Sequence, residues 1–469
     1  MLTYDLTQGD GPLYRRLYDA IRRDAISGNF DPCEKLPSKR TLARNLGVSA
    51  ITVENAYDQL ISEGFVYTLP KKGYFIAPSI PQKRRVAQVL DLEINATPNR
   101  AERGSDAASI LFDFSSNRAD PELLPFSAWA KMIRAAMTTR EKKLLEPSPG
   151  VGVLELRRAI ANYLASFRGL SVDPNQIVVG SGAEYLYGLV VQLLGRDKIF
   201  CVETPGYKKP RQIYEAQGVE CRLARIDDKG ARVDELKRVR ADVAHINPTH
   251  HFPTGVTATL SRRHELLAWA NERDERYVLE DDYDSEFRFN GRPIVPMFGL
   301  DPDKVVYMNT FSKSLAPTIR ISYMALPVAL ANRFYEKLGF YSCTVSTFDQ
   351  YALAEFLRQG YFERHINRMR LHYSRKRTRV LEIIRRALPP ETCRIIENDS
   401  GLHFILQLQT RYADAELQAR LLEKGVRLAA VSEFDEKEAE EYRGMFLLNY
   451  SGIDLNGLEN AVAILKDAM

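Results

Sequence analysis

From Phe112 onward, short strand-like apolar runs alternate with amphipathic helical segments, and this alternation constrains the fold more than any other feature. It is typical of an α/β domain whose mainly parallel sheet is covered by helices. Ligands bind open sheets of this kind beyond the carboxyl ends of the strands, so the residues that follow each strand are candidates for a binding site. The predicted strands are residues 176–179, 198–202, 244–246, 277–279 and 305–308.

The length of the chain, 469 residues, predicts more than one domain, because single hydrophobic cores stop growing beyond about 250–300 residues. From about residue 348 the pattern becomes helical and then returns to short strands, which predicts a smaller C-terminal subdomain. Between residues 78 and 110 apolar periodicity is weak and prolines recur, so this segment is predicted to be a linker. The predicted parts are residues 1–77, the linker 78–110, and residues 111–469, of which 348–469 contribute the small subdomain with strands at 402–408 and 445–449. Within the linker, the basic run at 83–85 is expected to be solvated, with an auxiliary phosphate contact as the alternative, and a short helix is expected at 86–92.

The composition limits the functions open to the chain. A net charge of +4 does not by itself indicate nucleic-acid binding, so the evidence for it must come from a local site. The five cysteines are scattered without a Cys-x-x-Cys pair, which argues against a disulfide framework or a zinc site and fits a reducing cytoplasm. The first residues do not predict a signal peptide, and the most apolar run, residues 185–194, is too short to span a membrane and is predicted to be a buried helix. We therefore expect a cytoplasmic protein without a membrane partner.

Residues 11–77 are predicted to form three helices and a two-stranded wing. Apolar residues recur at helical spacing after Leu13, and Gly28 ends this first helix. Ser38 and Ser49 are placed to cap the second and third helices. Two helices joined by a glycine-containing turn form the helix-turn-helix pattern. The wing strands are predicted at residues 65–67 and 74–76.

The sequence from Leu36 to Ala43, followed by residues 46–49 and 52–57, resembles the winged helix-turn-helix signature of the GntR family of regulators. The resemblance covers most of residues 11–77 and implies binding to double-stranded operator DNA. A winged helix used only for protein contacts is the alternative. Ala50 stands where the family often carries Arg, so the sequence preference on DNA stays open.

The donors in this module suit contacts with phosphates and base edges. Arg40 begins a helix, and hydroxyl groups start both capped helices, where they can reach the DNA backbone or the major groove. The lysines at the tip of the wing can approach the minor groove. The residues expected to contact DNA are Ser38, Arg40, Thr41, Ser49, Thr52, Tyr57, Lys71, Lys72 and Gly73.

Lys313 lies in the run from Thr310 to Arg320, about thirty residues after the acidic-aromatic cluster Glu280 to Tyr283. Together these segments supply what a pyridoxal phosphate pocket needs. An amine can form an imine with the cofactor aldehyde, a carboxylate can hold the pyridine nitrogen protonated, a phenol can reach the ring hydroxyl, and a guanidinium can bind the phosphate. A single lysine near Ser and Arg is usually a surface residue, so the hypothesis depends on the whole set.

Three further segments support the pocket. Residues 178–183 run from a strand into a helix start whose backbone amides can hold a phosphate. Residues 203–207 follow another strand and offer the aromatic face of Tyr207. Residues 247–255 form a Pro- and Gly-containing turn after a third strand. The order of these motifs resembles the fold-type I aminotransferases, and the whole chain resembles the MocR subfamily of GntR regulators.

The MocR resemblance implies a winged helix-turn-helix domain fused to an α/β, fold-type I, pyridoxal-phosphate-dependent aminotransferase-like domain. It further implies a homodimer and an internal aldimine (Schiff base) at Lys313. Asp281 would pair with the pyridine nitrogen, Tyr283 would bond the ring hydroxyl, and Tyr207 would stack on the ring. Phosphate contacts would come from Ser181, Gly182, Ala183, Thr310, Ser312 and Arg320.

Several neighbouring residues are expected to have structural roles. Asp282 is expected to face solvent or cap a helix, because the family's Asp-x-Tyr spacing favours Asp281 as the cofactor carboxylate. His250 and His251 could be a metal pair, but adjacent histidines on an extended segment point in opposite directions, so a turn lining the cofactor is expected and no metal site is predicted. His403 is expected to be a structural or pocket-edge residue.

Two departures from the family pattern argue against an efficient enzyme. An enzyme acting on amino acids needs a fixed cation, ideally a bidentate Arg, for the substrate carboxylate. In the family this Arg lies in a strand near the C-terminus, where this chain carries Leu447, and Arg443 is four residues earlier. The Tyr expected before Pro-x-Gly is also missing, with residues 144–146 in its place.

The sequence therefore predicts a pyridoxal-phosphate-dependent transcriptional regulator whose effector is an amine, an amino acid or pyridoxal phosphate itself. The alternatives are an active aminotransferase with a fused DNA-binding module, and a DNA-binding protein whose pocket no longer takes the cofactor. Residual transaminase-type half-reactions stay compatible with the regulator hypothesis.

Overall fold

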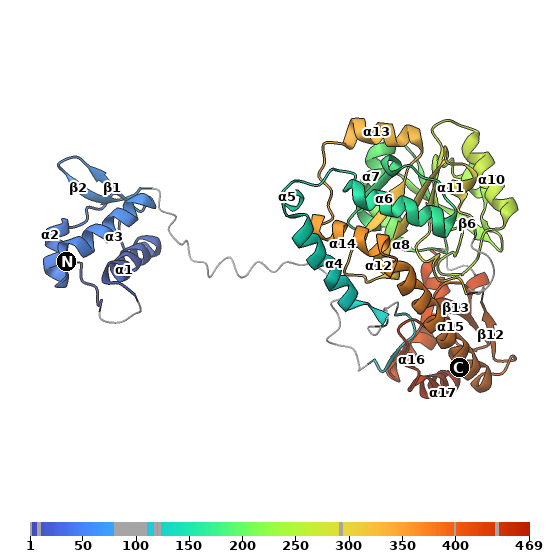
Figure 1. Cartoon of the computed structure of the whole chain (residues 1–469). Helices are drawn as coiled ribbons and strands as arrows, with labels where there is room; N and C mark the ends of the chain where they lie inside the picture. The colour runs from blue at the N-terminus through green and yellow to red at the C-terminus, as the bar shows by residue number, and fades with distance from the viewer. Residues whose placement is uncertain are drawn as a thin grey trace. The chain divides into compact units, whose positions relative to one another are not determined.

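The computed structural model describes residues 2–6, 11–78, 110–116, 120, 123–289, 294–397, 400–436 and 440–469. Contacts within the chain divide it into two compact units, residues 1–105 and 106–469 (Figure 1). The predicted basic run at 83–85 and the predicted helix at 86–92 lie outside the described residues.

The first unit contains the three predicted helices and the predicted wing. Gly28 ends the first helix in the left-handed conformation, with φ 79°. The hydroxyl oxygens of Ser38 and Ser49 accept hydrogen bonds from the backbone amides of Thr41 and Thr52, so both predicted caps are confirmed. The elements are α1 (Leu13–Ser27), α2 (Lys39–Leu46), α3 (Ala50–Ser62), β1 (Val66–Leu69) and β2 (Gly73–Ile76).

Tyr57 belongs to the core of this unit, and the expectation that it contacts DNA is corrected. Its side chain has 0% exposure, and its hydroxyl donates to the carbonyl oxygen of Pro37 at 3.0 Å. The cause is its place on the helix, since Tyr57 shares the apolar stripe of α3 with Val53 and Leu60, both also at 0% exposure.

The second unit is built on an eight-stranded sheet with the order β4-β11-β10-β9-β8-β5-β6-β7. The pairs from β10 to β6 are parallel, whereas β11 runs antiparallel to both of its neighbours. The predicted mainly parallel sheet is thus confirmed, and β6, β7 and β11 are additions to the predicted strands. The bounds are β4 (Ile177–Gly180), β5 (Phe200–Thr204), β6 (Cys221–Asp227), β7 (Gly230–Ala231), β8 (Val243–Ile246), β9 (Tyr277–Asp281), β10 (Val305–Thr310) and β11 (Ser322–Ala325).

Both faces of this sheet are covered by helices, because successive residues of its central strands enter two different hydrophobic cores. Met308 packs with α7 (Ala183–Leu194) and α13 (Val328–Leu338), whereas its neighbour Tyr307 belongs to the core that includes α6 (Leu154–Tyr163). The predicted buried helix at 185–194 is confirmed as part of α7. The other helices of the larger core are α4 (Phe126–Thr139), α10 (Leu260–Asn271), α14 (Thr347–Arg358) and α15 (Tyr361–Ala387).

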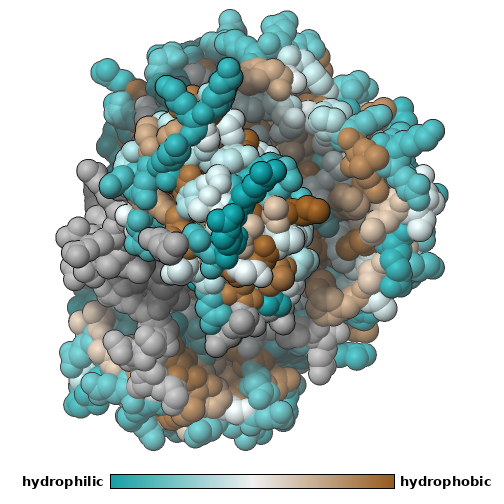
Figure 2. Space-filling model, turned by 90° about the vertical axis from the view of Figure 1, so that its left-hand side faces the viewer, coloured by the Kyte–Doolittle hydropathy of each residue, from teal (hydrophilic) through white to brown (hydrophobic). Residues whose placement is uncertain are grey.

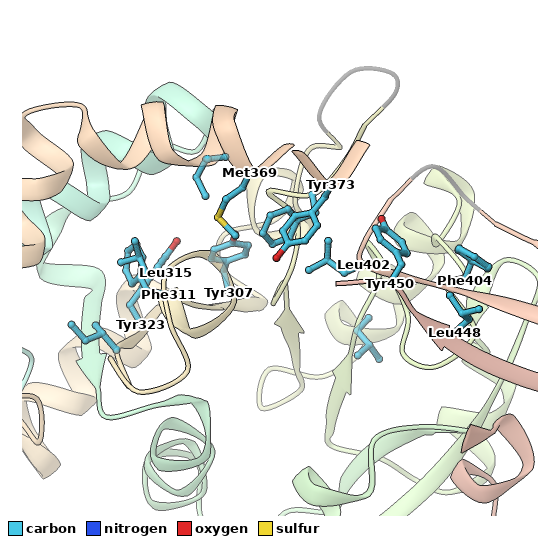
Figure 3. Close-up of a cluster of buried hydrophobic side chains, with 14 of the residues drawn as sticks. Tyr307, Phe311, Leu315, Tyr323, Met369, Tyr373, Leu402, Phe404, Leu448 and Tyr450 are labelled. Atoms are coloured by element: carbon cyan, nitrogen blue, oxygen red, sulfur yellow. The ribbon is translucent and has the colours of Figure 1, made fainter. Parts of the chain in front are cut away.

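The C-terminal part of the chain forms a smaller antiparallel sheet with the order β12-β13-β16-β15. Its core is continuous with that of the large sheet. Figure 3 shows Met369 and Tyr373 of α15 lying between Tyr307 on one side and Tyr450 on the other. The strands are β12 (Cys393–Ile396), β13 (His403–Leu408), β15 (Ala429–Ala430) and β16 (Met445–Asn449), and the helices are α16 (Asp414–Glu423) and α17 (Leu458–Ala468).

Figure 2 shows hydrophilic side chains over most of one face, with hydrophobic side chains in small separate groups. In the part of the chain that the structure describes, no helix is long and apolar enough to cross a membrane.

The burial of Tyr57 yields the first prediction. Tyr57→Phe removes the hydrogen bond to Pro37, so the opening free energy of the first unit should fall by about 1 kcal/mol. DNA affinity should stay unchanged. Hydrogen exchange of the α3 amides in the full chain and fluorescence anisotropy with duplex DNA measure the two quantities. Weaker DNA binding at unchanged amide protection would instead favour a DNA contact for this hydroxyl.

Candidate cofactor site and nucleic-acid interface

The residues expected to contact DNA gather at the starts of α2 and α3 and at the turn of the wing. Lys71 occupies the left-handed region, with φ 61°, in the turn between β1 and β2. The hydroxyl oxygens of each cap pair lie close together, 2.7 Å apart for Ser38 with Thr41 and 2.8 Å for Ser49 with Thr52. Ser38, Arg40, Thr41, Ser49, Lys71 and Lys72 are exposed, and Thr52 and Gly73 are partly exposed.

Lys39 is a further charged residue at this surface that the sequence analysis did not single out. Its ammonium group lies 2.6 Å from a carboxylate oxygen of Glu54 and 3.8 Å from one of Asp58. The hydrogen bond with Glu54 raises the pKa of Lys39. Lys39 therefore joins α2 to α3 and offsets the negative charge that α3 would present to DNA phosphates. In the sequence, only its position next to Arg40 could have indicated that Lys39 lies at this surface.

The second unit contains a cavity of about 380 Å³. It is formed where several strands of the large sheet end and where β16 of the smaller sheet approaches them. Four residues that the resemblance assigns to the cofactor, Tyr207, Asp281, Tyr283 and Lys313, line it together. The other lining residues are Ser115, Tyr187, Val202, Glu203, Gly206, Pro210, His245, Asn247, His251, Phe252, Leu447 and Asn449.

Lys313 is carried by the short helix α12 (Phe311–Ser314), which follows β10 directly. The hydroxyl of Thr310 caps this helix by accepting a hydrogen bond from the amide of Ser312 at 3.1 Å. Burial lowers the pKa of Lys313 to about 8, and the nearby carboxylate of Asp284 acts in the opposite direction. A larger share of the amine is therefore neutral near physiological pH, and the neutral amine is the form that attacks an aldehyde.

Asp281 ends β9 and is held in place from three sides. The hydroxyl of Tyr187 donates to its carboxylate at 2.6 Å. His245 Nε2 lies 3.4 Å from the same oxygen, while His245 Nδ1 lies 2.8 Å from the hydroxyl of Tyr214. The side-chain amide of Asn247 donates to the Asp281 backbone carbonyl at 2.8 Å. An imidazole protonated at Nε2 satisfies both of its contacts, so the carboxylate is fixed at the cavity wall.

Asp282, the next residue, lies on the opposite side of the strand, and the expectation that it faces solvent or caps a helix is wrong. Its carboxylate accepts hydrogen bonds from Arg168 at 2.6 Å and from the hydroxyl of Tyr307 at 2.7 Å. The Arg168 and Asp282 side chains are 2% and 1% exposed. Because the Asp282 amide still bonds the Met308 carbonyl, the chain stays extended and successive side chains point to opposite faces.

The residues expected to hold the phosphate form a second group beside the cavity. Backbone register brings them together, since Thr310 pairs with Ser322 and Ser322 pairs with Gly180, the residue before Ser181. A Cβ atom at Gly182 would lie 2.6 Å from Arg320 Nη2, so the guanidinium passes directly over this glycine. Ala183 begins α7, whose free amides favour an anion.

This second group adjoins the cavity through two elements. Ser312 immediately precedes Lys313 on α12, and α7 carries Tyr187 into the cavity wall. The six predicted phosphate residues, Ser181, Gly182, Ala183, Thr310, Ser312 and Arg320, are not themselves among the cavity-lining residues.

The remaining predicted residues lie at or near the cavity. Tyr283 is half-buried in the wall, and its hydroxyl donates to the His250 carbonyl at 3.2 Å. Tyr207 is 51% exposed and meets the ring of Phe252 edge-on. His403 is buried, packs its ring 4.6 Å from that of His250, and is not among the cavity-lining residues, which fits the structural one of its two expected roles.

The two adjacent histidines differ in their surroundings. His250 Nδ1 lies 2.8 Å from the carboxylate of Asp284. His251 lines the cavity, and burial lowers its pKa to about 3, so its imidazole is neutral. Within the described residues His251 Nε2 has no hydrogen-bond partner, and no group of three or more His, Cys, Asp or Glu residues could hold a metal.

Leu447, which the resemblance places where aminotransferases carry the carboxylate-binding Arg, lines the cavity. Among the described residues around the cavity, Lys313 is the only Lys and there is no Arg. Arg443 is not part of this lining; its guanidinium pairs with Glu440 at 3.2 Å and its side chain is 58% exposed.

The arrangement fits pyridoxal phosphate. It combines an amine of lowered pKa, a fixed carboxylate, the phenol of Tyr283 in the cavity wall, and a glycine under a guanidinium at a helix start, where a φ of 88° favours glycine. When bound, this cofactor supplies an electrophilic aldehyde and an electron-withdrawing ring. Lys313 would attach it, Asp281 would face its ring nitrogen, and the group around Arg320 would hold its phosphate. Tyr187, His245 and Asn247 support Asp281 but carried no motif that could have identified them.

Comparison with known proteins agrees with both units. The pattern of the family described as Aminotransferase class I and II matches residues 109–465, and that of the Bacterial regulatory proteins, gntR family, matches residues 13–76. The uncharacterized HTH-type transcriptional regulator YdeL of Bacillus subtilis is 36% identical over 424 residues, 90% of each chain. The pyridoxine biosynthesis transcriptional regulator PdxR of Corynebacterium glutamicum is 32% identical over 391 residues, 83% of this chain and 82% of PdxR.

Two further relatives extend the comparison. The probable rhizopine catabolism regulatory protein MocR of Rhizobium meliloti is 28% identical over 479 residues, covering 100% of this chain and 96% of MocR. The solved structure of a multiple substrate aminotransferase from Thermococcus profundus has a TM-score of 0.68 and 25% identity, covering 78% of this chain and 92% of that enzyme.

The adjacent carboxylates give a matched pair of substitutions. Asp281→Asn should weaken pyridoxal phosphate binding by about 10- to 100-fold, because a hydrogen bond to a charged group is lost, with little loss of stability. Asp282→Asn should instead lower the free energy of unfolding by about 3 to 5 kcal/mol, because it leaves Arg168 buried without its carboxylate. Cofactor titration and urea unfolding of the full chain measure the two effects. Equal losses of stability in both variants would contradict the separate roles.

The lowered pKa of Lys313 makes cofactor capture depend on pH. Below a pKa of about 8 the amine is mainly protonated, so the capture rate should rise with pH and level off above about 8. Visible absorbance and the mass of the borohydride-fixed adduct follow the reaction. Lys313→Ala should show neither signal. A rate that keeps rising to the ordinary lysine range near 10.5 would contradict the effect of burial.

Proposed function

Because this chain belongs to the aminotransferase class I and II family and joins it to a gntR-family domain, as MocR-subfamily regulators do, we propose that it is a pyridoxal-phosphate-dependent transcriptional regulator. The first unit binds operator DNA. The second unit holds the cofactor at Lys313 and reports a small-molecule signal.

The observation that favours a regulator over an aminotransferase is Leu447 in the cavity wall. An α-carboxylate entering this cavity meets an aliphatic side chain, and the only cation among the described lining residues is Lys313, which the cofactor would occupy. Holding the cofactor itself needs neither an Arg at this position nor the missing Tyr. The site therefore retains the groups for cofactor binding and, among its described lining residues, lacks a fixed cation for the carboxylate of an amino-acid substrate.

The proposed signal is pyridoxal phosphate itself or a primary amine that engages it. The relative named as a pyridoxine biosynthesis regulator supports the first choice. An amino acid is the weaker candidate, since its carboxylate would be buried beside Leu447 without a partner.

We propose that the protein acts as a homodimer in the cytoplasm. Leu145 and Phe340 of the second unit are 88% and 77% exposed, and large apolar side chains this accessible suit an interface with a second copy. Pairing would place two winged helices on a two-fold symmetric operator. A ligand that changes the state of Lys313 would bias the arrangement of the units and thereby operator affinity.

The proposal is tested by measuring binding to duplex DNA from upstream of the protein's own gene, with and without pyridoxal phosphate. We expect the cofactor to change the affinity of the wild type by at least about 5-fold, the lower end of typical allosteric coupling, and to leave Lys313→Ala unaffected. Tyr335→Phe, a partly exposed residue of α13, is the control and should respond as the wild type does.

A panel of amino acids separates the regulator from the enzyme. Conversion of the bound cofactor to its amine form at enzyme-like rates, together with a DNA affinity that is the same with and without the cofactor, would contradict the proposal and favour the aminotransferase. Absence of visible cofactor absorbance in the wild type would favour a pocket that no longer takes the cofactor.

A further inference from the structure

The recognition helix α3 has a solvent face made of Ile51, Glu54, Asn55 and Asp58, which recur at i, i+3, i+4 and i+7. The opposite face is buried in the core of the first unit. Ile51 is 68% exposed, in the first turn of the helix.

This face carries no positive charge. All residues of α3 are described, and its sequence contains neither Lys nor Arg. The commonest base contact, a Lys or Arg side chain on guanine, is therefore not available from this helix. The nearby cations are on α2 and on the wing, where they can contact phosphates. Lys39, one of them, is already bound to Glu54.

The apolar character of the first turn has a specific complement in DNA. In helix-turn-helix proteins the N-terminal residues of the recognition helix contact base edges in the major groove. The 5-methyl group of thymine is the apolar group displayed there. Ala50 and Ile51 are both exposed at this turn.

We propose that Ile51 reads the 5-methyl group of thymine in the operator and is a specificity-determining residue of this protein. The inference rests on the proposed binding of operator DNA. A single exposed aliphatic side chain is common on protein surfaces, but here it stands at the base-reading turn of a helix that has no cation to read guanine. Covering it with a methyl group removes apolar surface of both partners from water.

Replacing thymine by uracil tests this contact, because uracil in the duplex lacks only the 5-methyl group. The preferred site is first selected from random duplex DNA with the full-length protein. Each thymine is then replaced singly by deoxyuridine, and the dissociation constant is measured for the wild type and for Ile51→Ala. At one or two positions we expect uracil to weaken the wild type by about 3- to 10-fold and to leave Ile51→Ala unchanged.

Leu13→Ala is the matched control. Leu13 is an exposed aliphatic residue of α1, 45% exposed, and its removal should leave the discrimination between thymine and uracil at the wild-type value. Because Ile51 is also exposed, both variants should keep the wild-type melting temperature.

The possible failures are distinguishable. If the wild type selects a site but no uracil substitution has an effect that depends on Ile51, the methyl contact is wrong and DNA binding stands. If the wild type selects no duplex at all, DNA binding itself is wrong, and this inference falls with it.

Discussion

The cofactor site depends on the register of the parallel strands at the middle of the large sheet. Asp281 of β9 is paired with Met308 of β10, and Ile246 of β8 is paired with Glu280 of β9. This register brings the segment of Lys313, the carboxylate of Asp281 and the turn that begins at Asn247 to one edge of the sheet. Each of the three comes from a different part of the sequence, and only the hydrogen-bond ladder makes them neighbours.

The same ladder gives two adjacent carboxylates different tasks. Asp281 faces the cavity and is held by Tyr187 and His245, while Asp282 faces the core and pairs with Arg168. A shift of register by one residue would exchange their environments, placing Asp281 in the core and Asp282 in the cavity. Packing on both faces of the sheet, with Met308 in one core and Tyr307 in the other, opposes that shift.

Sequence patterns predicted the features that local physics determines. The caps at Ser38 and Ser49, the end of α1 at Gly28, and a lysine that follows a strand can each be recognised from a few neighbouring residues. The burial of Tyr57 could also have been predicted, since Tyr57 shares an apolar helical stripe with Val53. The predicted DNA contact of Tyr57 contradicts that pattern and is wrong. Asp282 was different, because its partner Arg168 lies 114 residues away and no local signal joins them. For the same reason the contacts of Tyr187 and His245 with Asp281 could not be predicted from the sequence.

The pairing of Lys39 with Glu54 separates two properties that many DNA-binding proteins combine in one helix. The cations that can release counterions from DNA lie on α2 and the wing, whereas α3 contains neither Lys nor Arg and its Glu54 is paired with Lys39. Ionic strength acts on the first set alone. Salt would then change how tightly this protein holds DNA in general without changing which sequence it prefers, so its selectivity would be the same at low and at high salt concentration.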